Sequence, residues 1–146
     1  MDLLYFGDNG WGDELAIATL MTIAVSITAM LIGFIFAALF TPLKLSKRKY
    51  LNLISNSYTT GIRGVPELLV IYLFFFGGSG AIMFVASIFG YNDYIEINAF
   101  LTGSFSIGII SGAYSTEVFR GAIQSIDRGQ FEAAKVLGIN KFGQFY

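Results

Sequence analysis

Residues 15–40 read LAIATLMTIAVSITAMLIGFIFAALF and contain no charged side chain. A helix over this stretch would be about 39 Å long, which exceeds the roughly 30 Å hydrocarbon thickness of a bilayer. Residues 68–92 and 97–116 are also free of charge. These gaps predict an all-α integral membrane protein with three transmembrane helices, at about 15–40, 65–90 and 97–116.

The composition excludes several classes of function. The chain has 146 residues, of which 55% are apolar and only 13% charged, and it contains neither cysteine nor histidine. A disulfide framework, the usual zinc or haem site and a Ser-His or Cys-His catalytic pair are therefore excluded. A net charge of -1 argues against binding to nucleic acid. We expect no metal site and no enzymatic activity, because the spans hold no nucleophile and base pair.

The distribution of charge predicts the orientation. The acidic N-terminal segment and the loop with Asp93 and Glu96 contain no lysine or arginine. The basic residues fall between the first two spans and after the third: Lys44, Lys47, Arg48, Lys49, Arg63, Arg120, Arg128, Lys135 and Lys141. The positive-inside rule then places the N-terminus outside and the C-terminus in the cytoplasm. The acidic start, with Asp2, Asp8, Asp13 and Glu14, and the long apolar run are unlike a signal peptide.

The second predicted span is the least regular, because glycines interrupt it at 77–80. One alternative starts the helix within residues 50–60, where Leu51, Ile54 and Tyr58 have an amphipathic spacing suited to the membrane interface. Pro66 would then kink the helix or reset its start. The glycine cluster would end it, and residues 81–89 would form a short separate piece. In every version residues 1–146 form a single domain.

Small residues recur along two of the predicted spans. They are Ala29, Gly33 and Ala37 in the first span and Ser104, Gly108, Ser111 and Ser115 in the third. Such stripes allow helix backbones to approach closely in lipid. We favour helix packing over a substrate-lining role for them. We also expect their partners to be helices beyond those that this chain supplies.

Charged residues at the ends of the spans are candidates for function. Glu117 and Arg120 have the i, i+3 spacing of an ion pair on one helix face, and Glu67 follows Pro66. They would either anchor the helix at the interface or contribute to a gate or substrate contact. None of them lies at a helix centre, which argues against a proton relay.

The segment after the third span predicts a short cytoplasmic helix at about 129–138. Residues 130–137 favour helix, and Gly138 fits the glycine that terminates one. Phe131, Ala134 and Leu137 would form an apolar side, either for docking to a partner or for lying back on the membrane or the helix bundle. Glu132 is expected in the first turn, where it would complement the helix dipole.

Three stretches carry a resemblance to a known family. Residues 132–138 read EAAKVLG, which resembles the EAA---G motif of ABC-importer permeases. Residues 63–70, RGVPELLV, and 112–123, GAYSTEVFRGAI, resemble two further motifs of polar amino-acid permeases, and residues 19–20 resemble their T-L pair. These motifs occur in the same order as in the family and extend along nearly the whole chain. Within the histidine, glutamine, arginine and opine family, the chain looks most similar to the octopine and nopaline Q-type permeases through residues 64–74, GVPELLVIYLF, and 76–79, FGGS.

The resemblance implies a bacterial inner-membrane subunit with a five-helix type I ABC-importer core, part of which this chain would supply. Such subunits form homo- or heterodimers, receive substrate from a periplasmic binding protein and contact a cytoplasmic ATPase, which holds ATP and magnesium. We therefore expect this chain to bind no cofactor itself. Because it ends at Tyr146, soon after Gly138, we interpret it as C-terminally truncated.

Carried over by residue, the resemblance identifies the ATPase-coupling helix through Glu132, Ala133, Ala134 and Gly138. Candidate gate or pathway residues are Arg63, Pro66, Glu67, Ser104, Ser111, Tyr114, Glu117 and Arg120. Two rival classes stay open: a secondary transporter or channel subunit, and a scaffold subunit without transport activity. Co-purification with an ATPase would distinguish the importer subunit from both.

Overall fold

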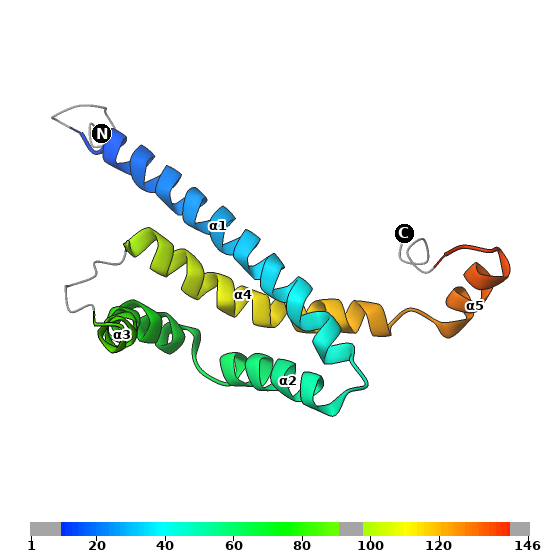
Figure 1. The fold of residues 1–146 in the computed structure, drawn as a ribbon. Coiled ribbons are helices and arrows are strands. Elements are labelled where there is room, and N and C mark those ends of the chain that lie inside the picture. Colours follow the sequence, from blue (N-terminus) through cyan, green and yellow to red (C-terminus); the bar gives the residue numbers. More distant parts are fainter. Residues whose placement is uncertain (1–9, 91–97, 141–146) are drawn as a thin grey trace.

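The computed structural model describes residues 10–90 and 98–140, most of which fold into α-helices (Figure 1). The helices are α1 (Gly12–Leu45), α2 (Lys49–Arg63), α3 (Glu67–Ile88), α4 (Ala99–Gln124) and α5 (Arg128–Val136). The described residues contain no strand, which confirms the all-helical prediction. Several residues used above lie outside the described residues: Asp2, Asp8, Asp93, Glu96, Ile97, Lys141 and Tyr146.

Within the described residues, α1 and α3 are long and apolar enough to cross a membrane. They cover most of the first and second predicted spans. Helix α4 has a comparable length, 26 residues, but its serines, threonines and glycines make it less apolar. The third span at 97–116 therefore stays a prediction. Asn98 starts α4 because its side-chain oxygen accepts hydrogen bonds from the N–H groups of Phe100 (2.8 Å) and Leu101 (3.3 Å).

The second span begins where proline resets the chain. Helix α2 ends at Arg63, and Pro66 is the N-cap residue of α3, so the alternative of a reset start is confirmed. The expectation that glycines 77–80 end the helix is wrong, since α3 continues to Ile88. Each glycine costs a helix only about 1 kcal/mol. The apolar residues on both sides have no better way to satisfy their backbone groups in lipid than to continue the helix.

The three long helices do not share one direction. Helices α1 and α4 run parallel, because Gly33 lies against Ser111 and Lys44 lies against Glu117. Helix α3 contacts α4 through Phe74, whose ring is 6.1 Å from that of Phe105, and it crosses α4 steeply, since Figure 1 shows α3 nearly end-on and α4 across the page. The N-terminal half of α1 diverges from α4 beyond their crossing (Figure 1).

The small-residue stripes of α1 and α4 pack against each other. A Cβ atom added at Gly33 would lie 3.0 Å from the Ser111 hydroxyl, and one added at Gly108 would lie 2.6 Å from Ile32 Cγ2. Ala29 and Ala37 are buried, and the Ala29 carbonyl would lie 3.1 Å from a Cβ added at Gly108. The expectation that these stripes need partners outside the chain is wrong, because each supplies the other's close approach.

Replacing Gly112 by alanine should destabilise the α1–α4 contact. The new Cβ would lie 2.6 Å from Phe36 Cβ and 2.8 Å from the Tyr58 hydroxyl oxygen, so a helix must shift at a cost of about 1–3 kcal/mol. Gly103→Ala is the matched control in α4, because no atom of the described residues lies within 4 Å of its added Cβ. Thermal unfolding in detergent should show a lower Tm for Gly112→Ala alone. Equal Tm values would contradict this packing.

Helix α2 packs against α1 and α4 through its polar side. The Ser55 hydroxyl donates to the Phe40 carbonyl (2.9 Å), and the Tyr58 hydroxyl donates to the Ile109 carbonyl (2.7 Å). The Asn52 amide donates to the Lys44 carbonyl at 2.5 Å, one of the carbonyls that the end of a helix leaves unpaired. Tyr58 therefore points inward, and the expected interfacial face formed by Leu51, Ile54 and Tyr58 is wrong.

Candidate functional site

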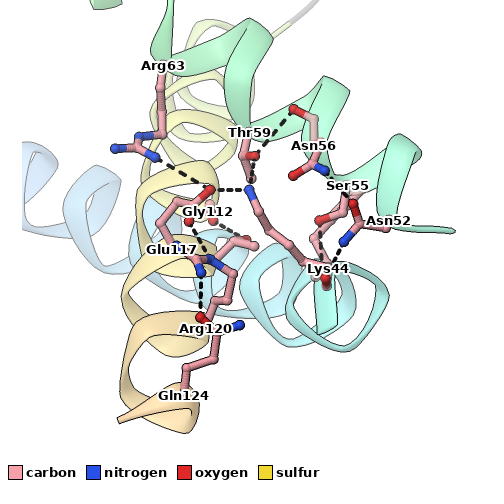
Figure 2. Close-up of polar contacts among 12 residues, drawn as sticks. Lys44, Asn52, Ser55, Asn56, Thr59, Arg63, Gly112, Glu117, Arg120 and Gln124 are labelled. Atoms are coloured by element: carbon pink, nitrogen blue, oxygen red, sulfur yellow. Dashed lines mark hydrogen bonds and ion pairs between the residues drawn. The ribbon is translucent and has the colours of Figure 1, made fainter. Parts of the chain in front are cut away.

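An ion cluster joins α1, α2 and α4 near the end of the predicted third span (Figure 2). The carboxylate of Glu117 pairs with the ammonium of Lys44, and its second oxygen accepts from Arg120 Nε at 2.8 Å. Arg63 Nη1 approaches from α2 to 3.6 Å. We call these residues, Lys44, Arg63, Glu117 and Arg120, the Glu117 cluster. One carboxylate thus holds cations from three helices together.

Polar side chains extend the cluster on both sides. The Lys44 ammonium also donates to the Thr59 hydroxyl, and Arg120 Nη1 donates to Gln124 at 2.6 Å. Beside them lies a polar cavity of about 370 Å³, lined by Lys44, Asn52, Asn56, Thr60, Glu117, Arg120 and Gln124. The amides of Asn52 and Asn56 form a hydrogen-bonded pair at its α2 wall (Figure 2).

The cluster fixes the ionisation state of Glu117, which lies one residue beyond the predicted span 97–116. Burial alone would raise the pKa of this carboxyl group. The hydrogen bonds and positive charges of Lys44 and Arg120 outweigh burial and lower the pKa to about 2. Glu117 is therefore a carboxylate at neutral pH. On α2, burial raises the pKa of Tyr58 to about 12, which keeps its hydroxyl protonated and able to donate.

Four of the candidate gate or pathway residues come together here. Arg63, Glu117 and Arg120 belong to the Glu117 cluster, and the guanidinium of Arg63 also lies 5.3 Å from the ring centroid of Tyr114, within cation–π range. The predicted i, i+3 pair of Glu117 and Arg120 is confirmed. The cluster contains no nucleophile and base pair. It can hold helices together or bind a charged group.

The other four candidates lie elsewhere. Pro66 and Glu67 start α3 and are exposed. Ser104 is fully buried, and Ser111 packs against Gly33 in the α1–α4 contact. Packing accounts for Ser111, whereas the buried Ser104 hydroxyl has no hydrogen-bond partner in the described part of the chain. A pathway role for them stays a prediction.

Sequence reasoning missed Lys44, which binds the same carboxylate from α1. Its side chain is only 8% exposed, unusual for a lysine. It is separated from Glu117 by 73 positions, so no helical spacing could reveal the pair. The available signal was that Lys44 is the first charge after a long apolar run. A charge directly at a span end is drawn to an opposite charge at the neighbouring span end.

Helix α5 ends as the sequence predicts. Gly138 has φ +73°. Its N–H donates to the Lys135 carbonyl and the N–H of Ile139 to the Ala134 carbonyl, both at 3.0 Å. These bonds form a Schellman motif, which requires the left-handed conformation that glycine adopts freely. The predicted helix terminator is confirmed.

The position of Glu132 differs from the expectation. Helix α5 begins at Arg128, earlier than the helix-favouring stretch 130–137, so Glu132 lies beyond the first turn. An explanation through the helix dipole is therefore wrong, since that effect is confined to the terminal turn. Glu132 and Ala133 are exposed, and Ala134 is half-buried. The helix projects beyond α4, apart from α2 and α3 (Figure 1).

The described residues do not form a cluster of side chains suited to bind a metal ion. Across residues 10–90 and 98–140, no three His, Cys, Asp or Glu side chains come together as possible ligands. The Glu117 carboxylate is already surrounded by cations, which disfavours a further positive ion. The cluster is a site for charge pairing.

Long apolar helices that pack through small residues, with an ion cluster toward one end, are typical of a membrane protein. The chain belongs to the family of binding-protein-dependent transport system inner membrane components, which its residues 29–146 match. The EAA motif at Glu132–Ala134 is characteristic of this family.

Individual relatives are similar over nearly the whole chain. The octopine transport system permease protein OccQ of Rhizobium meliloti is 44% identical over 97% of this chain and 60% of its own length. The nopaline permease NocQ of Agrobacterium fabrum is 46% identical over 95% of this chain and 59% of its own length. The histidine/lysine/arginine/ornithine permease HisQ of Salmonella typhimurium is 38% identical over 92% and 58%.

A solved structure supports the fold. The crystal structure of an amino acid ABC transporter with histidines matches with a TM-score of 0.61 and 29% identity, over 96% of this chain and 62% of that chain. The present chain thus spans about 60% of the length of the curated relatives that it matches.

Proposed function

We propose that the chain acts as a transmembrane permease subunit of an ATP-driven ABC importer for polar amino acids or opines. Family membership supports the transport role, and the similarity to octopine, nopaline and histidine/lysine/arginine/ornithine permeases supports the substrate class. The observation that carries the proposal is the exposed helix α5, which presents the EAA sequence and ends sharply at Gly138.

In this proposal, α5 docks into a cytoplasmic ATPase subunit that holds ATP and magnesium. Val136 and Leu137, at its end, are 87% and 76% exposed, and the helix projects from the bundle (Figure 1). An exposed apolar end on a projecting helix favours docking to a partner over lying back on the other helices. A second permease subunit, identical or different, and a periplasmic solute-binding protein complete the importer in the bacterial inner membrane.

The Glu117 cluster is the proposed gate element on the cytoplasmic side. It fixes the ends of α1, α2 and α4 to one another, so any opening between these helices must break its ion pairs. A secondary transporter or channel would require ionisable groups near mid-membrane, whereas Glu117 lies toward the end of α4. A scaffold subunit would not require the EAA helix.

The proposed orientation has three spans, with the N-terminus outside and the end of α5 in the cytoplasm. The parallel course of α1 and α4, whose C-terminal parts are joined by the Lys44–Glu117 ion pair, supports it. The basic residues of α2 and α5 would then lie on the cytoplasmic side, as the positive-inside rule requires.

Single-cysteine labelling tests this orientation, because the chain has no native cysteine. Asp8→Cys and Asn92→Cys should react with an impermeant thiol reagent in intact cells. Ser46→Cys and Gln130→Cys should react only after the membrane is opened. External labelling at position 130 would contradict the three-span topology.

The function itself is tested by co-expression with the ATPase subunit of an octopine importer. The tagged chain should retain the ATPase through purification in detergent, and the complex should hydrolyse ATP. The ATPase of an unrelated importer serves as the control. Equal recovery of both ATPases would contradict specific coupling through α5.

A further inference from the structure

Helix α2 has the reverse of the amphipathic arrangement found in soluble proteins. Its buried residues are polar, namely Ser55 and Thr59. Its exposed residues include Tyr50, Leu53 and Ile54, which are 57%, 64% and 52% exposed. The spacing i, i+3, i+4 places these three on one face. Such a face is stable only against an apolar environment.

Three consecutive cations, Lys47, Arg48 and Lys49, precede this face, and all are exposed. They lie at the N-terminal end of α2, where unpaired N–H groups and the helix dipole are also positive. The first turn of α2 has no acidic residue and its N-cap makes no side-chain hydrogen bond, whereas α1 carries two acidic residues in its first turn. The first turn of α2 therefore gathers positive charge that nothing offsets.

The neighbouring carboxylate is not available to these cations. Glu117 is occupied by Lys44, Arg63 and Arg120. Within the described part of the chain, no ion pair involves residues 47–49. Arg48 Nη1 instead donates to the Tyr50 hydroxyl at 3.0 Å, which connects residues 47–49 to the apolar face. We call residues 47–49, between α1 and α2, the cationic corner. Its charges are not balanced by an anionic side chain of the described residues.

We propose that the corner between α1 and α2 binds the phosphate group of an anionic phospholipid, with an acyl chain along Tyr50, Leu53 and Ile54. The charge of the phosphate complements residues 47–49 and the positive end of the helix. The apolar face begins one residue later and accommodates the hydrocarbon. A free phosphate ion would use the charges and leave the apolar face uncovered, so the combined surface favours a lipid.

Quenching by brominated lipids tests the site in vesicles of defined composition. The full chain carrying Trp11→Phe and Tyr50→Trp has one tryptophan, placed at the site, because Trp11 is the chain's single native one. Brominated phosphatidylglycerol should bind beside it more than about tenfold more strongly than brominated phosphatidylcholine, because about one kcal/mol per cation near a membrane surface corresponds to a roughly fivefold preference for each of the three cations.

Charge-matched variants separate a site from general attraction. Lys47→Gln combined with Lys49→Gln should lower the preference for phosphatidylglycerol to about the fivefold that the remaining cation, Arg48, supplies. Arg128→Gln combined with Lys135→Gln removes two charges from α5 and should leave the preference unchanged. An equal loss in both double variants, or no preference in the parent protein, would overturn the proposal.

Two further experiments identify the ligand: a variant of the apolar face and a competition with inorganic phosphate. Leu53→Gln should weaken quenching by both brominated lipids, because it disrupts the acyl contact. Excess inorganic phosphate should leave the lipid preference unchanged beyond the effect of equal ionic strength from chloride. If inorganic phosphate abolished the preference selectively, the corner would be a site for free phosphate, and the lipid proposal would be wrong.

Discussion

Glu117→Gln should destabilise the bundle by about 3 kcal/mol, the lower end of the cost of breaking a buried ion pair. The change leaves the ammonium of Lys44, which is 8% exposed, without its carboxylate and beside Arg120. Chemical denaturation in detergent should show the loss. Glu67→Gln is the control, because it removes the same charge from an exposed position at the start of α3 and should change stability little.

A double variant separates the stranded charge from a loss of packing. Lys44→Met combined with Glu117→Gln removes both partners of the buried pair, so it should lose less stability than Glu117→Gln alone. A larger loss in the double variant would mean that the aliphatic stem of Lys44, and not its charge, dominates.

The stability that the wild-type Glu117 cluster contributes should depend on pH. The pKa of Glu117 is lowered from its ordinary value near 4.5 to about 2, so the folded state binds this proton less readily than the unfolded state. Its stabilising contribution is therefore complete above pH 4.5 and is lost as the pH falls towards 2. Glu117→Gln should remove this dependence, which denaturation at stepped pH would measure.

The sequence predicted features that depend on local chemistry. Uncharged runs located α1 and α3, Pro66 located the start of α3, and Gly138 located the end of α5. Each depends on a property of neighbouring residues, such as the fixed φ of proline or the left-handed φ of glycine. The i, i+3 pair in α4 was predictable for the same reason.

Features that depend on which helices meet could not be read from spacing. The stripe containing Gly33 was identified as a packing face, but not its partner at Ser111. The sequence spacing of Tyr58 predicts a residue at the membrane interface. The side chain instead points inward, because its hydroxyl donates a hydrogen bond to the Ile109 carbonyl. Lys44 joins Glu117 only because α1 and α4 run parallel, a relation that emerges on folding.

Gly138→Asp should abolish transport in an assembled importer and weaken ATPase binding while leaving membrane insertion intact. Gly138 has φ +73°, where a side chain costs about 1 kcal/mol or more. Among residues 10–90 and 98–140, no atom lies within 4 Å of the added Cβ, so we expect the remaining effect at the partner surface, where a charge would be desolvated. Substrate uptake and ATPase co-purification should both fall.

Further substitutions assign the cause. Gly129→Asp adds the same charge to α5 at a position with open space around it, and its place near the helix N-terminus is electrostatically favourable, so transport should persist. Gly138→Asn tolerates the left-handed conformation without a charge and should retain more uptake than Gly138→Val, which is strained there. Glu132→Ala should be milder than Gly138→Asp, because Glu132 is exposed and lies outside the terminal turns.

Normal uptake by Gly138→Asp would remove the main support for α5 as the coupling helix. If Gly129→Asp failed equally, added charge would be the cause, because only position 138 requires the left-handed turn that aims the end of α5.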